Sequence, residues 1–382
     1  MLDFVTACLA DRGFEPVIAY YKPYSVDPRL SVPMYCLGWR RVGTRILTDR
    51  QGHEIHEIGS WLPELEVTHY APTHHWRALI ASCRHHIVVS GSCLAALPFA
   101  ATGTTFLMWI ATPWRADRRQ REAHLSLGRR AFDMLVVRPL ASRIERATLR
   151  KGTLLALSQY TRARLDGVAG RSVVRDVMPR PIETNTFFPY PARVSTLRLG
   201  FTGRLDDARK NIELLFRATW MCRQSGLEVT LTLVGGALPD RLWELAVRLG
   251  IRDCLEVLPF LPRHQLVPLL QSLDVFVIPS EQEGLCIAAL EAMACGCPVV
   301  STRCGGPEEF VVDEKTGYLC EPAPMEMSRK IQAIVRDRDL RSQLSRGARA
   351  LVESKYSFAA AERIFWRAFD STFVEERTCL QS

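Results

Sequence analysis

Two glutamates lie eight residues apart in a segment rich in small residues, Ser280 to Pro298. Glu283 precedes Gly284 where a strand pattern gives way to a helix pattern, and Glu291 lies on that helix. Eight residues are a little over two helical turns, so both carboxylates can face the same side. The N–H groups around Gly284 and Leu285 suit a phosphate, because helix N-termini favour anions. A carboxylate two turns along would meet sugar hydroxyls. The spacing therefore predicts a site for a phosphorylated sugar.

Two cations, Arg204 and Lys210, follow a strand pattern that ends at Gly203. A phosphate leaving group gains negative charge as its bond breaks, and fixed cations stabilise that charge. Either residue alone would be an ordinary surface side chain. The prediction that they bind phosphate rests on their position directly after a strand.

The C-terminal half alternates strictly between strand and helix patterns. The expected strands have unbroken apolar runs and are Leu197–Thr202, Val229–Val234, Leu255–Leu258, Val275–Ile278 and Val299–Ser301. The expected helices are Asn211–Gly226, one ending at Leu249, His264–Leu273 and Cys286–Ala294. This alternation indicates a parallel sheet covered by helices on both faces. In such sheets ligands bind at the carboxyl ends of the strands, where the charges and glycines described above gather.

The N-terminal half shows a weaker pattern of the same kind. It begins with a helix over residues 4–12 and a strand at Pro16–Tyr21, and further strands are expected at Ile87–Ser90, Thr105–Ile110 and Leu154–Ser158. Proline-rich residues 179–191 are expected to link two domains. The 382 residues, 47% apolar and 24% charged, suffice for two domains with separate cores.

Charge and cysteine usage narrow the protein class further. About +7 of the net charge of +8 comes from residues 114–151, which hold eleven Arg or Lys and four Asp or Glu. Twelve scattered cysteines without a CxxC pair predict buried thiols in a reducing compartment. The N-terminus lacks a signal-peptide pattern and no apolar run is long enough to span a bilayer. These features favour a cytoplasmic protein.

The motif-bearing segments resemble a known family. Ser280 to Pro298 is similar to the E-x7-E signature of GT-B glycosyltransferases, specifically glycosyltransferase family 4. The continuation from Cys297 to Glu308, the Thr316-Gly-Tyr-Leu run and the Gly200–Asn211 segment also resemble that family's pattern. The resemblance is dense from about residue 154 to 360 and thin before it. It implies an α/β fold of two Rossmann-like doubly wound domains facing a cleft.

The resemblance assigns roles to individual residues. Arg204 and Lys210 would grip the donor diphosphate, and Glu291 would hold the ribose hydroxyls. Glu283 would contact the transferred sugar near its anomeric carbon, and backbone groups near Leu261 would meet the base. Together with Gly203, Gly284 and Leu285 these residues form the expected donor site. The family reacts with retention of configuration, the donor phosphate taking the acceptor proton on the same face.

The expected function is therefore transfer of a hexosyl group from a UDP- or GDP-sugar to a glycan, lipid-linked or small-molecule acceptor. Cell-envelope or exopolysaccharide biosynthesis is the expected setting. The nucleotide sugar is a substrate, and neither cofactor nor metal is expected, because Asp337-Arg-Asp339 lies in a charged helical stretch far from any strand end. Residues 1–185 would form the acceptor-side domain and residues 186–358 the donor domain, with the helix at 359–382 packing back on the first.

Two departures from the family's pattern leave an alternative open. The chain begins in what would be the first helix of the N-domain, so the domain's first strand is expected to be missing and the natural start to lie upstream. No histidine follows the strand near Ile110, where Thr112, Trp114 or Asp117 are the acceptor-side candidates. A non-catalytic or truncated GT-B relative that binds nucleotide or a partner is therefore the alternative.

The basic segment Arg115 to Lys151 has two interpretations. It is either a set of solvated helix faces or a peripheral contact with an anionic membrane on its inner face, where clustered cations contribute ~1 kcal/mol each. Aromatic residues are not interleaved with the basic run, which argues against nucleic acid as a partner. A dinucleotide-dependent oxidoreductase is disfavoured because no GxGxxG follows a strand.

Overall fold

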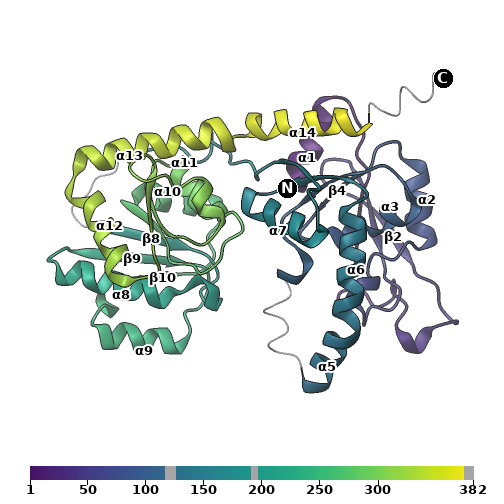
Figure 1. Cartoon of the computed structure of the whole chain (residues 1–382), viewed down its shortest axis with the longest axis horizontal. Helices are drawn as coiled ribbons and strands as arrows, with labels where there is room; N and C mark the ends of the chain where they lie inside the picture. The colour runs from purple at the N-terminus through teal and green to yellow at the C-terminus, as the bar shows by residue number, and fades with distance from the viewer. Residues whose placement is uncertain (117–125, 191–196, 374–382) are drawn as a thin grey trace. The chain divides into compact units, whose positions relative to one another are not determined.

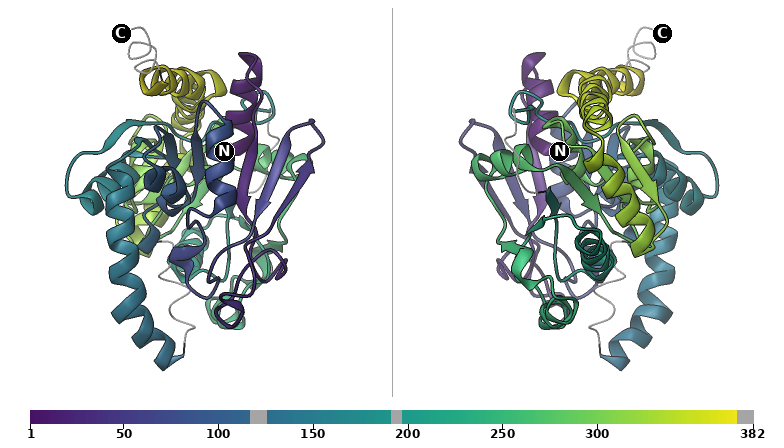
Figure 2. Two further views of the ribbon diagram at one scale, coloured as in Figure 1. Left: turned by 90° about the vertical axis from the view of Figure 1, so that its right-hand side faces the viewer. Right: turned by 90° about the vertical axis from the view of Figure 1, so that its left-hand side faces the viewer.

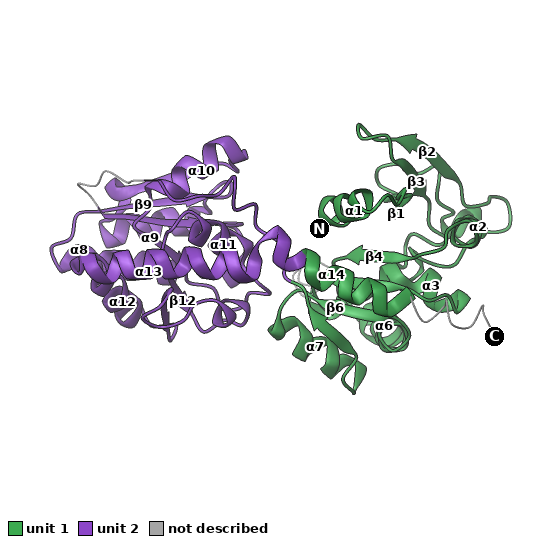
Figure 3. Cartoon of the chain, turned by 90° about the horizontal axis from the view of Figure 1, so that it is seen from above, with its two compact units in different colours: residues 1–178, 362–382 green, residues 179–361 purple. Residues whose placement is uncertain are grey.

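A computed structural model of the chain describes residues 1–116, 126–190 and 197–373. The chain divides into two compact units (Figure 3). Unit 1 comprises Met1–Met178 and Glu362–Ser382, and unit 2 comprises Pro179–Ala361.

Unit 2 contains, within the described residues, a six-stranded sheet whose neighbouring strands all pair in parallel. The strand order is β10-β9-β8-β11-β12-β13. The strands are β8 Leu197–Thr202, β9 Val229–Val234, β10 Leu255–Leu258, β11 Val275–Ile278, β12 Val299–Thr302 and β13 Gly317–Cys320. Four of the five strand ranges predicted here coincide with the observed bounds, and β12 is one residue longer. Strand β13 was not assigned as a strand.

The helices of unit 2 form two groups around this sheet. Helices α8, α9 and α12 pack together, and α11 contacts both α10 and α13 (Figure 1). Their bounds are α8 Ile212–Gln224, α9 Asp240–Leu249, α10 Arg263–Ser272, α11 Ile287–Ala294, α12 Pro324–Arg336 and α13 Arg338–Leu351. The predicted alternation of strand and helix is thus confirmed.

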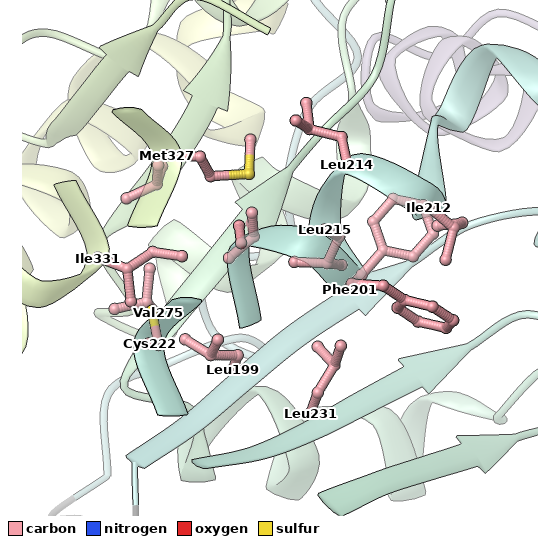
Figure 4. Packing of buried hydrophobic residues seen from close by; sticks show 14 of the residues in the cluster. Leu199, Phe201, Ile212, Leu214, Leu215, Cys222, Leu231, Val275, Met327 and Ile331 are labelled. Atoms are coloured by element: carbon pink, nitrogen blue, oxygen red, sulfur yellow. The ribbon is translucent and has the colours of Figure 1, made fainter. Parts of the chain in front are cut away.

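Apolar side chains on the strands of unit 2 explain why helices must cover them. Leu199 and Leu231 from neighbouring strands belong to one buried cluster with Leu215 of α8 and Ile331 of α12, which Figure 4 shows from close by. Each of these side chains is fully buried. Because each fully buried large apolar side chain contributes roughly 1.5–3 kcal/mol, this burial contributes most to holding the strands and their loops in place.

Unit 1 contains two sheets among the described residues. Strands β4 Ile87–Ser90, β5 Leu107–Ile110, β6 Thr153–Ala156 and β7 Val174–Val177 form a parallel sheet in that order. Strands β1 Ile18–Tyr21, β3 Glu54–Ile58 and β2 Thr44–Thr48 form the second. Both β1 and β4 lie at the end of their sheet. The described strands of unit 1 are therefore divided between two sheets, whereas the prediction was a single doubly wound sheet.

The β2–β3 hairpin was not predicted. Its strands run antiparallel, from Thr44 opposite Ile58 to Thr48 opposite Glu54. The chain reverses at Asp49, whose carboxylate accepts hydrogen bonds from the backbone N–H groups of Gln51 and His53, and at Gly52, which has φ = 90°. Most side chains of β2 are exposed, so the strand lacks the apolar pattern on which the predictions relied.

The helices of unit 1 are α1 Leu2–Asp11, α2 His74–Ser82, α3 Leu97–Thr102, α5 Leu127–Phe132, α6 Arg138–Leu149 and α7 Gln159–Ala169. Helix α14, Phe358–Phe373, belongs to this unit from Glu362 onward. Its aromatic side chains contact the start of the chain: the ring of Phe365 lies 6.3 Å from that of Phe4, and Arg12 lies over Trp366. None of the described helices is both long and apolar enough to cross a bilayer.

Candidate functional site

The strand order of unit 2 fixes where a ligand can bind. The chain enters the sheet at β8, proceeds outward through β9 and β10, and returns to the other side of β8 for β11, β12 and β13. The topological switch point therefore lies between β8 and β11. In open parallel sheets the crevice outside the carboxyl ends of the strands at this point is the usual ligand site. The loop containing Arg204 and Lys210 leaves β8 there, and the loop containing Glu283 leaves β11.

Glycines allow the loops after β8 and β9 to touch. The N–H of Gly203 donates to the carbonyl of Val234 (2.9 Å). A Cβ on Gly235 would lie 1.7 Å from the carbonyl oxygen of Gly203, which no side chain tolerates. Gly235 also has φ = 148°, inside the region that favours glycine. The two glycines therefore bring two backbone segments together at the edge of the switch point.

Lys210 and Glu283 form the ion pair that joins the two loops. The ammonium Nζ of Lys210 donates to Oε1 of Glu283 at 2.7 Å, and both side chains are largely buried. A second bond in the same place links the backbones, because the N–H of Glu281 donates to the carbonyl of Arg209 (2.8 Å). The structure thus brings together two residues that lie 73 positions apart and that were predicted separately.

Three further bonds orient Glu283. The hydroxyl of Ser280 donates to the same oxygen that Lys210 contacts, at 2.7 Å. The N–H of Glu283 donates to the carbonyl of Cys304 (2.8 Å), and the carbonyl of Glu283 accepts from the N–H of Gly306 (3.0 Å). A Cβ on Gly306 would lie 2.4 Å from the carbonyl oxygen of Gly284. The loop after β12 therefore fixes the backbone of Glu283, while Lys210 and Ser280 fix its carboxylate.

Asp207 organises the cations after β8. Its carboxylate accepts from the guanidinium of Arg204 (2.9 Å) and from Arg209 at Nη2 (2.8 Å) and Nε (3.2 Å). Burial by itself would raise the pKa of Asp207, but the bonds from Arg209 and the charge of Arg204 hold that pKa below its ordinary value. Arg204 remains more than half exposed, so its guanidinium can still contact a solvent-borne phosphate. Neither Asp207 nor Arg209 was predicted as a site residue, although both stand in the quoted Gly200–Asn211 segment.

The two residues predicted to offer backbone N–H groups, Gly284 and Leu285, lie just before α11, which spans Ile287–Ala294. Gly284 is exposed, whereas the side chain of Leu285 is buried, so only the backbone of Leu285 can serve a ligand. The residue before the helix, Cys286, has φ = 64°, an uncommon conformation for a residue with a side chain. The helix begins at Ile287 and carries Glu291 on its second turn.

Glu291 faces a second group of charges. Burial raises the pKa of its carboxyl to about 6, although the positive charges of Arg180 and Arg263 partly oppose this shift and Glu183 adds to it. Arg263 is paired with Glu183 at 2.6 Å. Arg180 and Glu183 belong to the segment that was predicted to be an interdomain linker, and neither was predicted to lie near the site. No periodic pattern marks them, so the sequence contained no signal that could have identified them.

The loop after β10 lies beside the glycines after β9. Leu261 is half-buried and its neighbour Phe260 is exposed, and the ring of Phe260 would lie 3.7 Å from a Cβ on Gly236. The predicted base-contacting residues thus stand at the carboxyl end of the same sheet as Gly203.

The candidates outside the donor site have varied surroundings. Trp114 is only 2% exposed, its N–H donates to Glu145 and its indole N–H to Glu66, so it is part of the core of unit 1. Asp337 caps α13, accepting from the N–H groups of Asp339 and Leu340. Asp117, Arg118, Arg119 and Arg121 lie outside the described residues. No group of three or more His, Cys, Asp or Glu side chains gathers as metal ligands within residues 1–116, 126–190 and 197–373.

Solved structures identify the class of fold. The chain is similar to a sucrose-phosphate synthase from Thermosynechococcus elongatus, with a TM-score of 0.71 and 18% identity over 96% of this chain and 91% of that one. It is also similar to HepE from Anabaena, solved with UDP, with a TM-score of 0.65 and 18% identity over 78% of this chain and 82% of that one. The fold is that of the GT-B glycosyltransferases, an α/β fold with two Rossmann-like domains, as predicted.

Sequence comparison identifies the family of the C-terminal half. Residues 183–351 match the family model described as Glycosyl transferases group 1, so they form a domain of that family. A D-inositol 3-phosphate glycosyltransferase from Frankia alni is 31% identical over 192 residues, covering 45% of this chain and 47% of the relative. A GDP-mannose-dependent alpha-(1-6)-phosphatidylinositol monomannoside mannosyltransferase from Mycolicibacterium smegmatis is 32% identical over 183 residues, covering 43% and 48%. The matched part spans about half the length of these relatives.

Proposed function

We propose that this chain is a retaining glycosyltransferase of family 4 that transfers a hexosyl group from a nucleoside-diphosphate sugar to an acceptor hydroxyl. The observation that carries the proposal is the Lys210–Glu283 pair at the switch point between β8 and β11. An ammonium and a carboxylate 2.7 Å apart give the donor diphosphate a cation and the attached sugar a hydrogen-bond acceptor within the span of one ligand.

The proposed chemistry breaks the bond between the anomeric carbon and the diphosphate oxygen, which leaves with the electron pair. Lys210 and Arg204 stabilise the charge that develops on this leaving group. The acceptor oxygen forms the new bond on the same face, and its proton passes to the departing phosphate. Glu283 orients the sugar and stabilises positive charge near the anomeric carbon, while ionised Glu291 accepts hydrogen bonds from the ribose hydroxyls. The proposed reaction uses neither a metal nor another cofactor.

The names of the similar proteins support particular classes of donor and acceptor for the proposed reaction. One relative is described as GDP-mannose-dependent and one similar structure was solved with UDP, which supports a GDP- or UDP-sugar as donor. The names of both relatives include an inositol compound, one of them a lipid, which supports a lipid-linked or small-molecule acceptor; a glycan acceptor is proposed as well. We propose a cytoplasmic role in cell-envelope or exopolysaccharide biosynthesis, with peripheral membrane contact through residues 115–151.

A non-catalytic relative that binds nucleotide without transfer is the second candidate. The observation that favours it is the division of unit 1 into two sheets with β1 and β4 at their ends, since the acceptor side would then be incomplete. Donor-site geometry alone does not separate the two candidates, because both need Lys210 and Arg204.

Thermal unfolding with UDP, GDP, ADP and TDP tests the proposal. A nucleotide at 100 times its dissociation constant adds about 2.7 kcal/mol of stability, which is visible as a higher melting temperature. We expect one nucleotide to stabilise the wild type but not Arg204→Ala. The matched control is Arg217→Ala, which removes an exposed arginine of α8 that pairs with Glu213 one turn away on the same helix. A wild type that no nucleotide stabilises would contradict the donor-site proposal.

Release of the sugar then separates the two candidates. The nucleotide that stabilises the protein is supplied as its sugar conjugate with acceptor mixtures, and free nucleoside diphosphate and the anomeric configuration of the product are measured. Transfer with retention supports the enzyme. Nucleotide binding without any sugar release or transfer supports the non-catalytic candidate.

A further inference from the structure

An apolar stripe runs along the outer surface of the helix that begins at α5. Phe132, Leu135, Val136 and Leu140 are all exposed, and Leu135 is exposed over 75% of its surface. Relative to Phe132 they lie at positions i+3, i+4 and i+8, the spacing of one helical face. Pro139, which is also exposed, lies at position i+7 on the same face. The stripe crosses the π-helical turn Asp133–Val137 and continues into α6.

A neighbouring face of the same helix packs on the rest of unit 1. Asp133, Val137 and Ala141 are buried, four residues apart, and Val137 and Ala141 share a cluster with Trp114. The exposed apolar side chains of this helix are therefore different from Val137 and Ala141, which belong to the core. The exposed stripe has no role in that core, and single exposed apolar residues are common, whereas a contiguous stripe marks an interaction surface.

Arginines border the stripe at both ends. Arg129 and Arg130 precede it, and Arg143, Arg146 and Arg150 follow it, the last three lining a hollow of about 270 Å³ with Ser142 and Ala147. Arg146 is held at Nε by the carbonyl of Val168 (3.2 Å), and Arg150 by that of Ala169 (3.0 Å). Among the described residues no carboxylate pairs with Arg143, Arg146 or Arg150. Their charges are thus available to an anionic partner.

A second exposed apolar segment adjoins the start of this helix through Glu64. The carbonyl of Glu64 accepts from the guanidinium of Arg129 (2.8 Å), and its carboxylate accepts from the N–H of Met34 (3.0 Å). Met34 and Tyr35 are strongly exposed, and Trp39 is exposed over 94% of its surface. Tryptophan and tyrosine beside cations are typical of surfaces that lie at a membrane interface.

We infer that the stripe Phe132–Leu140 inserts into the surface of an anionic bilayer, with the arginines of α6 binding lipid headgroup phosphates. This inference rests on the proposed membrane contact of residues 115–151. It adds a second contribution to binding, because apolar side chains insert into the bilayer in addition to the attraction between arginines and anionic lipids. The stripe spans about 12 Å along the helix axis at 1.5 Å per residue, far less than a bilayer core. The helix therefore lies in the interface and does not cross the membrane.

The charges favour a membrane over a second copy of the chain. Two copies that buried this stripe against each other would bring their bordering arginines together, and like charges across an interface oppose association. A nucleic acid would satisfy the arginines but would leave Leu135, Val136 and Leu140 without a suitable contact. An anionic lipid surface satisfies both the apolar and the basic side chains.

Sedimentation of the full chain with lipid vesicles tests the inference. One set of vesicles is phosphatidylcholine, and the other contains phosphatidylglycerol as well. The test variants are Leu135→Gln with Leu140→Gln, which removes the stripe, and Arg143→Gln with Arg146→Gln, which removes the adjoining charge. The matched controls are Val247→Gln and Arg248→Gln, which replace an exposed valine and an exposed arginine of α9 in unit 2.

We expect the wild type and both controls to bind the anionic vesicles, and each paired variant to lose about tenfold or more in partition coefficient. Binding of the wild type should also weaken as salt is raised, a measurement that needs no variant. The inference would be overturned if the wild type bound vesicles with and without phosphatidylglycerol equally well. It would also be overturned if the stripe variant bound anionic vesicles as well as the wild type does. A stripe variant that only converts a dimer to a monomer in sedimentation velocity would identify a second copy as the occupant instead.

The melting temperature with donor nucleotide is measured on the same samples. A variant that keeps its nucleotide shift but loses vesicle binding supports the membrane surface independently of the donor site. If nucleotide does not raise the melting temperature of the wild type, that result would contradict the proposed function but not the membrane surface.

Discussion

Glu291 offers a test in which stability and ligand binding depend on the same proton. Burial raises the pKa of this carboxyl from 4.5 to about 6 in the folded protein. The folded state therefore holds the proton more tightly than the unfolded state, and folding is penalised once the group ionises. The penalty is absent well below pH 4.5, grows between pH 4.5 and 6, and is complete above pH 6.

The size of this penalty follows from the shift of about 1.5 pKa units. At 1.36 kcal/mol per unit the full cost is about 2 kcal/mol, and at pH 5 only about 0.8 kcal/mol of it is present. The variant Glu291→Gln, which cannot ionise, should thus gain about 1.2 kcal/mol of stability relative to the wild type between pH 5 and pH 8. The exposed residue Glu244 on α9 supplies the control variant Glu244→Gln, for which no such gain is expected.

Urea unfolding at both pH values measures the difference, and nucleotide titration at the same pH values measures the functional side. Since ribose hydroxyls donate to a carboxylate, wild-type nucleotide affinity should fall as pH drops below 6, and Glu291→Gln should bind weakly at every pH. If Glu291→Gln gains no more stability relative to the wild type between pH 5 and pH 8 than Glu244→Gln does, the assigned burial of Glu291 would be refuted. A pH-independent affinity in the wild type would refute the assigned ribose contact.

Three further substitutions test the loops around the switch point. Asp207→Asn should weaken nucleotide binding about tenfold in titration calorimetry, because the arginines it holds lose their charged partner. Ser280→Ala removes one hydrogen bond from Glu283 and should lower the transfer rate about tenfold while nucleotide affinity stays within twofold or so, and an equal loss of both would contradict a positioning role. Gly235→Ala should destabilise folding by roughly 3 kcal/mol in urea unfolding, since its Cβ would overlap the carbonyl oxygen of Gly203; a native-like midpoint would show that the two loops do not touch.

The sequence predicted the parts of the fold that depend on strong apolar periodicity. In unit 2 the strands are buried on both faces, so unbroken runs such as Val275–Ile278 matched the observed bounds. The β2–β3 hairpin was missed because its exposed side chains alternate weakly and its position depends on a turn at Asp49 and Gly52. Strand β13 was quoted within a family motif without being recognised as a strand. The prediction of buried thiols holds for seven of the eleven cysteines in the described residues, whereas Cys36, Cys83, Cys254 and Cys286 are partly exposed.

The residues proposed for the candidate site could be named from the sequence, but their contacts could not. Loop residues after β8 and β11 could be named because parallel sheets place strand ends at one edge. That Lys210 bonds Glu283 directly, and that Asp207 holds two arginines, depends on backbone geometry that no local pattern encodes. The surroundings of Glu291 were equally hidden, since Arg180 and Glu183 come from a proline-rich stretch with no periodicity. The exposed stripe around Leu135 has helical spacing, yet sequence alone cannot distinguish it from a core-facing stripe.

Calorimetric titration of Lys210→Ala and Glu283→Gln tests the central claim most directly, using the stabilising nucleoside diphosphate and its sugar conjugate as ligands. If Lys210 grips the diphosphate, Lys210→Ala should bind both ligands about ten- to a hundredfold more weakly than the wild type. If Glu283 contacts the transferred sugar, Glu283→Gln should weaken the sugar conjugate while leaving the free nucleotide close to its wild-type affinity. Wild-type affinity of Lys210→Ala for both ligands would contradict a donor site at the switch point between β8 and β11.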